Sequence, residues 1–283
     1  MTEEKTGCYE LYQQVVMTLK SRIQTLPDYP TGLMVLDNYL WGFHPAELVV
    51  LGGRTGEGKS SLGLFFASQL ATKCPVLFYS LEMSKETLMR RLIAQTVKID
   101  HKLLRRNQCE GKEINKIIAA KHFFESIDLT FTKKGFKWSD VEAEYNKYKP
   151  KVIVFDFLQL MFKVGSDKVE ALTELVRKFK EFAEQKKLII ILLSQINRAP
   201  TDRANKRPTL ADMKGSGAIE ETADTIIATY WEYLSKIKER KTNTKINKNK
   251  MELLILKQRE GDTGIENVRF TPEYYSFENY YEG

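Results

Sequence analysis

The sequence predicts an α/β fold with a mostly parallel central sheet, and three observations support this. Continuous apolar runs of strand length alternate with segments of helical periodicity, which is typical of buried parallel strands joined by helices. A glycine-rich loop separates the first of these strands from the helix that follows it. Short strand-like stretches close the chain, so antiparallel C-terminal strands are expected beside the parallel ones.

Each element is predicted from its own local signal. Strands are expected where apolar and β-branched residues run together, and helices where apolar residues recur three or four positions apart. Ser84 is a suitable N-cap for the helix after it. The polar segment 197–214 contains Pro200 and Pro208 and is expected to be a long loop. The predicted strands are 47–51, 76–80, 127–131, 152–156, 188–194, 225–231, 251–257, 266–270 and 275–277, and the predicted helices are 61–73, 85–96, 113–126, 139–148 and 169–185.

Residues 1–30 are predicted to form an amphipathic linker helix and a linker ahead of one large domain, residues 31–283. Prolines and a glycine between positions 27 and 32 end the helical pattern. The apolar face needs a partner surface, which is either the flank of the domain or a neighbouring subunit. The apolar positions at helical spacing are Leu11, Val15, Val16, Leu19 and Ile23.

Composition argues against several classes of protein. The longest apolar stretch, 188–193, is too short to span a bilayer, and the N-terminus has no apolar signal core, so a cytoplasmic protein is expected. Three scattered cysteines and three scattered histidines predict neither a disulfide framework nor a zinc site. Much of the net charge of +7 comes from residues 236–250, which hold seven lysines and arginines and one glutamate. A solvated loop is favoured there over a DNA contact, and both stay open.

The segment that begins at Gly53 has the spacing of a P-loop. Small residues let the backbone curl around an anion, while the loop N–H groups and the following helix N-terminus point at negative charge. Lys59 is expected to reach the outer phosphates of ATP, and Ser60 to supply a hydroxyl ligand to Mg²⁺. A glycine-rich turn with a surface lysine is the disfavoured alternative. The predicted nucleotide-binding residues are Gly53, Arg54, Thr55, Gly56, Glu57, Gly58, Lys59, Ser60 and Ser61.

Three further polar side chains lie at or just after the ends of buried strands, at the edge where open α/β sheets bind their ligands. Asp156 is predicted to hold Mg²⁺ through water, and Glu82 to act as the general base on the attacking water. Gln195 is predicted to contact the γ-phosphate and to sense it. Two plainer alternatives remain: Asp156 merely ends a strand, or Glu82 caps the next helix.

Lys257 and Arg259 lie two positions apart at the end of a predicted strand, so both are expected on one face. Such a basic pair suits a finger that reaches the nucleotide of a neighbouring subunit. Taken alone, the two side chains would more often be solvated charges at a sheet edge.

Together these segments resemble the motor domain of the DnaB-type replicative helicases over about residues 31–280. The resemblance implies a RecA-like P-loop ATPase that forms a hexameric ring around single-stranded DNA, binds ATP between subunits and unwinds duplex during replication. It also implies that Arg259 and Lys257 act in trans on the neighbour's nucleotide. The DNA-binding residues that it implies are Arg198, Lys214, Gly215, Ser216 and Gly217. The matching stretches are 31–37 with Gly42-Phe43, the P-loop, Ser80-Leu81-Glu82-Met83, 156–161, 193–198, 216–220 with Ala223-Asp224, and Lys257-Gln258-Arg259.

The sequence departs from the family pattern in three places. Gly215 and Lys214 stand where relatives usually carry glutamate and arginine. Glu57 is an unusual acid beside phosphates, and its side chain is expected to point outward. The usual helical N-terminal domain is expected to be missing, which suggests either a minimal phage, plasmid or mobile-element helicase or a protein that diverged toward another use of the same motor. The expected setting is a bacterial host, with the protein encoded by the host or by a phage or plasmid, and a primase or a helicase loader is the candidate partner.

Two other functions stay open at this point. An oligomeric ATPase switch of the circadian-clock or recombination-mediator type would bind nucleotide and a protein partner without unwinding DNA. A strand-exchange filament fits less well, because the Leu81-Glu82-Met83 and Lys257-Gln258-Arg259 triplets match the helicase better.

Overall fold

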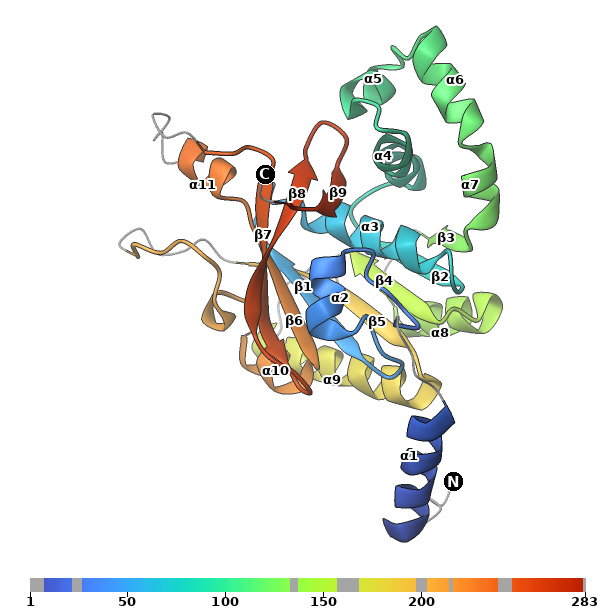
Figure 1. Ribbon diagram of the computed structural model, residues 1–283, viewed down its shortest axis with the longest axis vertical. Helices are drawn as coiled ribbons and strands as arrows, with labels where there is room; N and C mark the ends of the chain where they lie inside the picture. Colours follow the sequence, from blue (N-terminus) through green and yellow to red (C-terminus); the bar gives the residue numbers. More distant parts are fainter. Residues whose placement is uncertain are drawn as a thin grey trace.

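A nine-stranded sheet forms the centre of the molecule, with helices packed on both of its faces (Figure 1). The computed structural model describes residues 8–21, 27–132, 137–156, 168–196, 203–213, 216–238 and 246–281. The strand order is β3-β2-β4-β5-β1-β6-β7-β8-β9. The strands are β1 (Leu48–Gly53), β2 (Val76–Ser80), β3 (Leu129–Thr132), β4 (Val152–Asp156), β5 (Ile189–Gln195), β6 (Thr225–Tyr230), β7 (Lys250–Gln258), β8 (Gly264–Thr271) and β9 (Ser276–Asn279).

The sheet confirms the predicted architecture. Strands β1 to β6 pair in parallel, and β7, β8 and β9 add to the β6 edge as antiparallel strands. Strand β1 lies between β5 and β6, so the loop after it emerges near the middle of the sheet. All residues of β1, β2, β4 and β6 are buried, which is why their sequences are continuous apolar runs rather than alternating ones.

Two apolar cores cover the two faces of the sheet. Successive strand residues point to opposite faces, so Val49 and Leu51 pack with α2, α3 and α4, whereas Leu48 and Val50 pack with α8, α9 and α10. The helices are α1 (Cys8–Ser21), α2 (Met34–Leu40), α3 (Lys59–Leu70), α4 (Lys85–Val97), α5 (His101–Arg106), α6 (Gly111–Ala119), α7 (Lys121–Ser126), α8 (Trp138–Tyr148), α9 (Lys168–Lys186), α10 (Ser216–Thr222) and α11 (Glu232–Lys238).

The helices differ from the prediction in two respects. The single helix expected over 113–126 is wrong, because α6 ends at Ala119 and α7 begins at Lys121. The N–H of Ala120 is shared between the carbonyls of Lys116 and Ile117, a tightening typical of a helix end. Helices α2, α5, α10 and α11 were not predicted, since segments of six or seven residues are too short to show a clear period.

The N-terminal helix is confirmed over the described part of its predicted range, and residues 22–26 lie outside that part. Its large apolar side chains are exposed at Tyr9, Leu11, Tyr12, Val15 and Met17. The flank of the domain, as far as it is described, therefore leaves Leu11 and Val15 of the predicted apolar face uncovered, whereas Val16 is half-buried. Figure 1 shows α1 at the N-terminal end of the chain, away from α4 to α7.

The cysteines do not form disulfides with one another, since Cys8, Cys74 and Cys109 are free thiols. Within the described ranges, no cluster of histidine, cysteine or acidic residues has the geometry to hold a metal ion. Within the same ranges, no helix is both long and apolar enough to cross a membrane.

Candidate functional site: a nucleotide pocket

The P-loop has the conformation that its sequence predicts. It connects the end of β1 at Gly53 to the start of α3 at Lys59. Gly56 and Gly58 have φ angles of +88° and +77°, a left-handed region that strongly favours glycine. Gly58 is also the N-cap of α3, so the N–H groups of the first helical turn face the loop. A phosphate bound here would meet backbone donors and the positive end of the helix dipole.

The side chain of Glu57 does not point outward, and that expectation is wrong. Glu57 is only 2% exposed. Its Oε2 atom accepts the backbone N–H of Arg54 at 3.2 Å, and its Oε1 atom lies 3.8 Å from the Arg54 guanidinium. The Glu57 carboxylate therefore forms contacts within the P-loop, and the positive charge of Arg54 partly neutralises it. It does not present its negative charge to a bound phosphate.

A buried carboxylate stands directly behind the loop. Asp156, at the end of β4, accepts the Ser60 hydroxyl at 3.1 Å and lies 3.6 Å from the ammonium group of Lys59, in both cases through its Oδ1 atom. Its Oδ2 atom is buried and has no hydrogen-bond partner among the described residues. A carboxylate oxygen left unpaired beside a serine hydroxyl is a donor set that suits hydrated Mg²⁺, so the residues fit the predicted metal.

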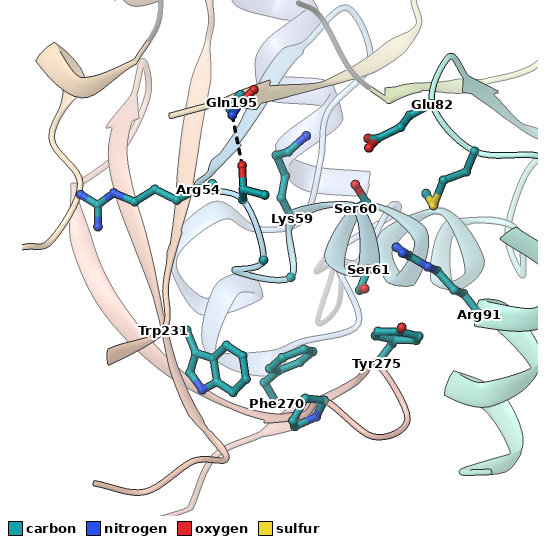
Figure 2. A pocket seen from close by; sticks show the side chains of 16 residues that line it. Arg54, Lys59, Ser60, Ser61, Glu82, Arg91, Gln195, Trp231, Phe270 and Tyr275 are labelled. Atoms are coloured by element: carbon teal, nitrogen blue, oxygen red, sulfur yellow. Dashed lines mark hydrogen bonds between the residues drawn. The ribbon is translucent and has the colours of Figure 1, made fainter. Parts of the chain in front are cut away.

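Burial lowers the pKa of Lys59, and the negative charges of Asp156 and Glu82 oppose that effect. Glu82 therefore lies within electrostatic reach of the lysine. Figure 2 shows its carboxylate on the same side of the pocket as Lys59 and Ser60. The alternative role of Glu82 as a helix cap is wrong, because Ser84 is the N-cap of α4 and its hydroxyl accepts the N–H of Thr87 at 3.2 Å.

Gln195 faces the P-loop from the last position of β5. Its amide donates to the hydroxyl of Thr55 at 3.1 Å, and Gly53 is its register partner across the strand pair (Figure 2). A side chain that already contacts the loop is well placed to respond to a γ-phosphate bound there.

The P-loop, Glu82 and Gln195 line a cavity of about 340 Å³ that is closed by residues the sequence did not single out for binding. Phe270 and Tyr275 come from β8 and the turn before β9, and Arg91 comes from α4. The guanidinium carbon of Arg91 lies 4.9 Å from the centre of the Tyr275 ring. Aromatic faces and a cation beside a phosphate site can hold a base and a ribose.

Trp231 is buried and also lines this cavity (Figure 2). Its ring packs edge-on against Phe270, with 5.3 Å between the ring centroids. The tryptophan therefore belongs to the aromatic wall of the pocket.

The aromatic residues that line the pocket could not be predicted from the sequence, because they lie far from the P-loop in the chain. The antiparallel return of β8 and β9 brings Phe270 and Tyr275 to α3 and α4. Arg91 also lines the pocket and is the exception, because it could have been suggested from the sequence. It is a basic residue on α4, the helix that follows Glu82.

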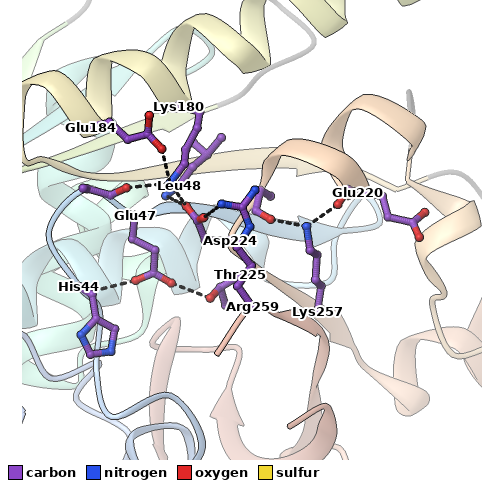
Figure 3. Close-up of polar contacts among 12 residues, drawn as sticks. His44, Glu47, Leu48, Lys180, Glu184, Glu220, Asp224, Thr225, Lys257 and Arg259 are labelled. Carbon is purple, nitrogen blue, oxygen red and sulfur yellow. Dashed lines mark hydrogen bonds and ion pairs between the residues drawn. The ribbon is translucent and has the colours of Figure 1, made fainter. Parts of the chain in front are cut away.

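Lys257 and Arg259 lie toward the opposite end of the sheet from the P-loop, because β7 runs antiparallel to β6 and β6 runs parallel to β1. Figure 3 shows both side chains near Asp224. Lys257 donates to the carbonyls of Glu220 and Ala223 at 2.5 and 2.6 Å. Arg259 pairs with Asp224 at 3.1 Å. Both side chains thus reach the same turn, as the shared face predicts, and neither lines the nucleotide cavity of its own chain.

Partial burial lowers the pKa of Lys257, and the nearby charge of Arg259 adds to that effect. The predicted pair is therefore brought together, with its two positive charges close enough to influence each other.

The predicted DNA-binding residues are described only in part. Arg198, Lys214 and Gly215 lie outside the described residues. Ser216 begins α10, and Gly217 is exposed in its first turn.

The basic segment 236–250 starts inside α11 and ends at the first residue of β7. Lys248 pairs with Glu273 at 2.9 Å, and its carbonyl accepts the indole N–H of Trp231 at 2.8 Å. At least this part of the segment contacts the domain, so it is not wholly a solvated loop. Residues 239–245 lie outside the described part of the chain.

The fold and the pocket define a P-loop α/β protein, with the pocket at the carboxyl edge of a mostly parallel sheet. The family described as DnaB-like helicase C terminal domain matches residues 29–279, and the chain belongs to this family.

Named relatives agree with this assignment. The chain is 30% identical over 281 residues to the replicative DNA helicase DnaB of Geobacillus stearothermophilus, covering 95% of this chain and 60% of that protein. It is also 30% identical over 285 residues to a probable replicative DNA helicase of Trieres chinensis, covering 96% and 62%. The chain therefore spans about 60% of the length of these relatives.

Two solved structures show the same RecA-like fold. One, described as an ATPase domain, superposes with a TM-score of 0.86 at 24% identity, covering 98% of this chain and all of that one. A DnaB-like replicative helicase, described with its interactions with primase, gives a TM-score of 0.83 at 24% identity, covering 98% of this chain and 68% of that one.

Proposed function

We propose that this chain is the ATP-driven motor of a hexameric replicative helicase that moves along single-stranded DNA and separates duplex. The observation that carries the proposal is the distance between the two halves of the catalytic machinery. Along β1, the P-loop end at Gly53 and the end at Leu48, where Asp224 and Arg259 lie, are about 17 Å apart at about 3.3 Å per residue. In the proposed assembly, a second copy therefore supplies the basic pair to each nucleotide.

Within one pocket, the P-loop N–H groups and Lys59 bind the phosphates, and Glu82 orients the attacking water. Ser60 and Asp156 would hold Mg²⁺, which neutralises charge on the β- and γ-phosphates when it is bound. Arg259 and Lys257 of the adjacent subunit stabilise the charge that develops on the γ-phosphoryl group.

The remaining assignments complete the proposal. Residues 31–283 form the motor, and the helix in residues 1–30 uses its exposed apolar face to dock on the neighbouring subunit. Single-stranded DNA is gripped by Arg198 and by the segment Lys214, Gly215, Ser216 and Gly217. A primase or a helicase loader is the partner, and the protein works in the cytoplasm of a bacterial host, encoded by the host or by a phage or plasmid.

The test measures ATP hydrolysis with and without single-stranded DNA, together with the unwinding of a forked duplex. Wild-type protein should show DNA-stimulated hydrolysis and unwinding, and Lys59→Ala should abolish both. The matched control is Lys73→Ala, an exposed lysine beyond the far end of α3, which should change neither activity. Equal hydrolysis with and without DNA, and no unwinding at any protein concentration, would contradict the proposal. That result is expected of an ATPase switch.

A further inference from the structure

One carboxylate organises the end of the sheet that carries the basic pair. Asp224 lies in the turn between α10 and β6, and its side chain is 13% exposed. Both of its oxygens are engaged by donors from other elements (Figure 3).

The Oδ2 atom of Asp224 is anchored to the rigid core. It accepts the backbone N–H of Leu48 at 2.8 Å and the ammonium group of Lys180 at 2.7 Å. Leu48 is the first residue of β1, and Lys180 projects from α9 and also donates to the carbonyl of Ala46 at 3.0 Å. Charge-assisted hydrogen bonds from a strand and a helix fix the position of this carboxylate.

The Oδ1 atom of Asp224 is left for Arg259, whose Nη1 atom lies 3.1 Å away. The backbone N–H of Arg259 also donates to the carbonyl of Asp224 at 3.0 Å. The Arg259 side chain is 51% exposed and follows the last residue of β7. An exposed arginine side chain must lose rotamer entropy before it can act at a defined point.

The contact with Asp224 fixes the guanidinium in advance through one of its nitrogens. A guanidinium offers five donors in a rigid fork, so the others stay available to a second anion. The sheet itself does not need this contact, since Leu48 and Lys180 already hold the turn. The bond from Asp224 to Arg259 therefore serves to orient a guanidinium whose other donors can bind an anion on a neighbouring chain.

We infer that Asp224 is a positioning residue for hydrolysis in the neighbouring subunit, because it orients Arg259 toward that subunit's γ-phosphate. The inference rests on the proposed function, in which Arg259 acts in trans. Asp224 touches neither the nucleotide nor the water, and it acts through the guanidinium that it holds.

The first experiment replaces Asp224 by asparagine and separates kcat from KM in ATP hydrolysis. The pocket of the same chain is distant, so KM for ATP should stay at the wild-type value. Misplacement of a catalytic group by about 1 Å costs about 100-fold, so kcat should fall by that order. Glu184→Gln is the matched control, because Glu184 pairs with the same Lys180 at 3.1 Å and does not contact Arg259. Its kcat should equal that of wild type.

The second experiment mixes Asp224→Asn protein with Lys59→Ala protein in the absence of DNA. A Lys59→Ala subunit has no working pocket but carries an intact Asp224 and Arg259. It should restore hydrolysis in an adjacent Asp224→Asn subunit, so the mixture should hydrolyse ATP faster than the two separate proteins added together. A role for Asp224 inside its own chain would give no such gain.

If Asp224→Asn unfolds the chain because Lys180 loses its nearest carboxylate, the double variant Lys180→Met with Asp224→Asn removes both charges. It should fold, keep the wild-type KM and show the same loss of kcat. Mixtures that stay inactive while wild type is active, or a variant with normal kcat, overturn the inference alone. Wild-type protein that hydrolyses no ATP overturns the proposed function and this inference together.

Discussion

Replacing Asp156 by asparagine should separate metal binding from nucleotide binding, because the side chain keeps its shape and loses its charge. Asp156 is fully buried. At an effective dielectric constant of about 20, the 3.6 Å separation from the ammonium group of Lys59 gives an attraction of about 5 kcal/mol, before the opposing desolvation is counted. Loss of a group that holds metal-bound water typically costs about 10–100-fold in metal affinity.

The assay follows phosphate release at saturating ATP while Mg²⁺ is titrated. The Mg²⁺ concentration that gives half the maximal rate should rise about 10–100-fold in Asp156→Asn. A fluorescent ATP analogue in EDTA should bind this variant at least as tightly as wild type, since the phosphates then replace the negative charge that Lys59 has lost.

The matched control is Asp37→Asn, a part-buried carboxylate outside the cavity that accepts the N–H of Thr31 at 2.8 Å. It should leave both measurements unchanged. An unchanged Mg²⁺ requirement in Asp156→Asn would refute the metal assignment. Loss of analogue binding in EDTA would show instead that the buried ion pair holds the pocket in shape.

Three further outcomes are expected. Phe179→Ala empties a fully buried site against β4 and should lower the free energy of unfolding, measured by urea denaturation, by about 3–5 kcal/mol; a loss below about 1 kcal/mol would contradict this packing. Ser84→Ala removes the N-cap of α4 and should cost about 1 kcal/mol in the same assay without changing KM for ATP; a raised KM would give Ser84 a role in the pocket. Burial raises the pKa of Cys74 to about 11, so at pH 8 iodoacetamide should label exposed Cys8 first, and labelling of Cys74 should rise about tenfold per pH unit up to that pKa. Equal labelling of the two thiols at pH 8 would contradict the burial of Cys74.

The parallel part of the fold was predictable because its signals are local. Fully buried strands appear in sequence as continuous apolar runs, and β2 and β4 begin and end where those runs do. The short helices could not be predicted in this way, because tertiary packing and not periodicity stabilises segments of six or seven residues.

The sequence by itself determined the chemistry at the ends of the strands. The P-loop spacing requires glycine where φ is positive, and Asp156, Glu82 and Gln195 lie at or just after the carboxyl ends of strands that meet at one edge. Local sequence patterns are enough to predict where these residues lie, because parallel strands place their carboxyl ends at the same edge of the sheet.

Only the tertiary structure decided what surrounds that chemistry. The antiparallel return of β8 and β9 placed Phe270 and Tyr275 on the nucleotide cavity. Folding of the loop turned Glu57 inward onto Arg54. The pairing of β6 with β7 set Arg259 against Asp224, at the far end of the sheet from its own P-loop. These contacts join residues far apart in the chain or depend on how a loop closes, and neither periodicity nor spacing encodes such a relation.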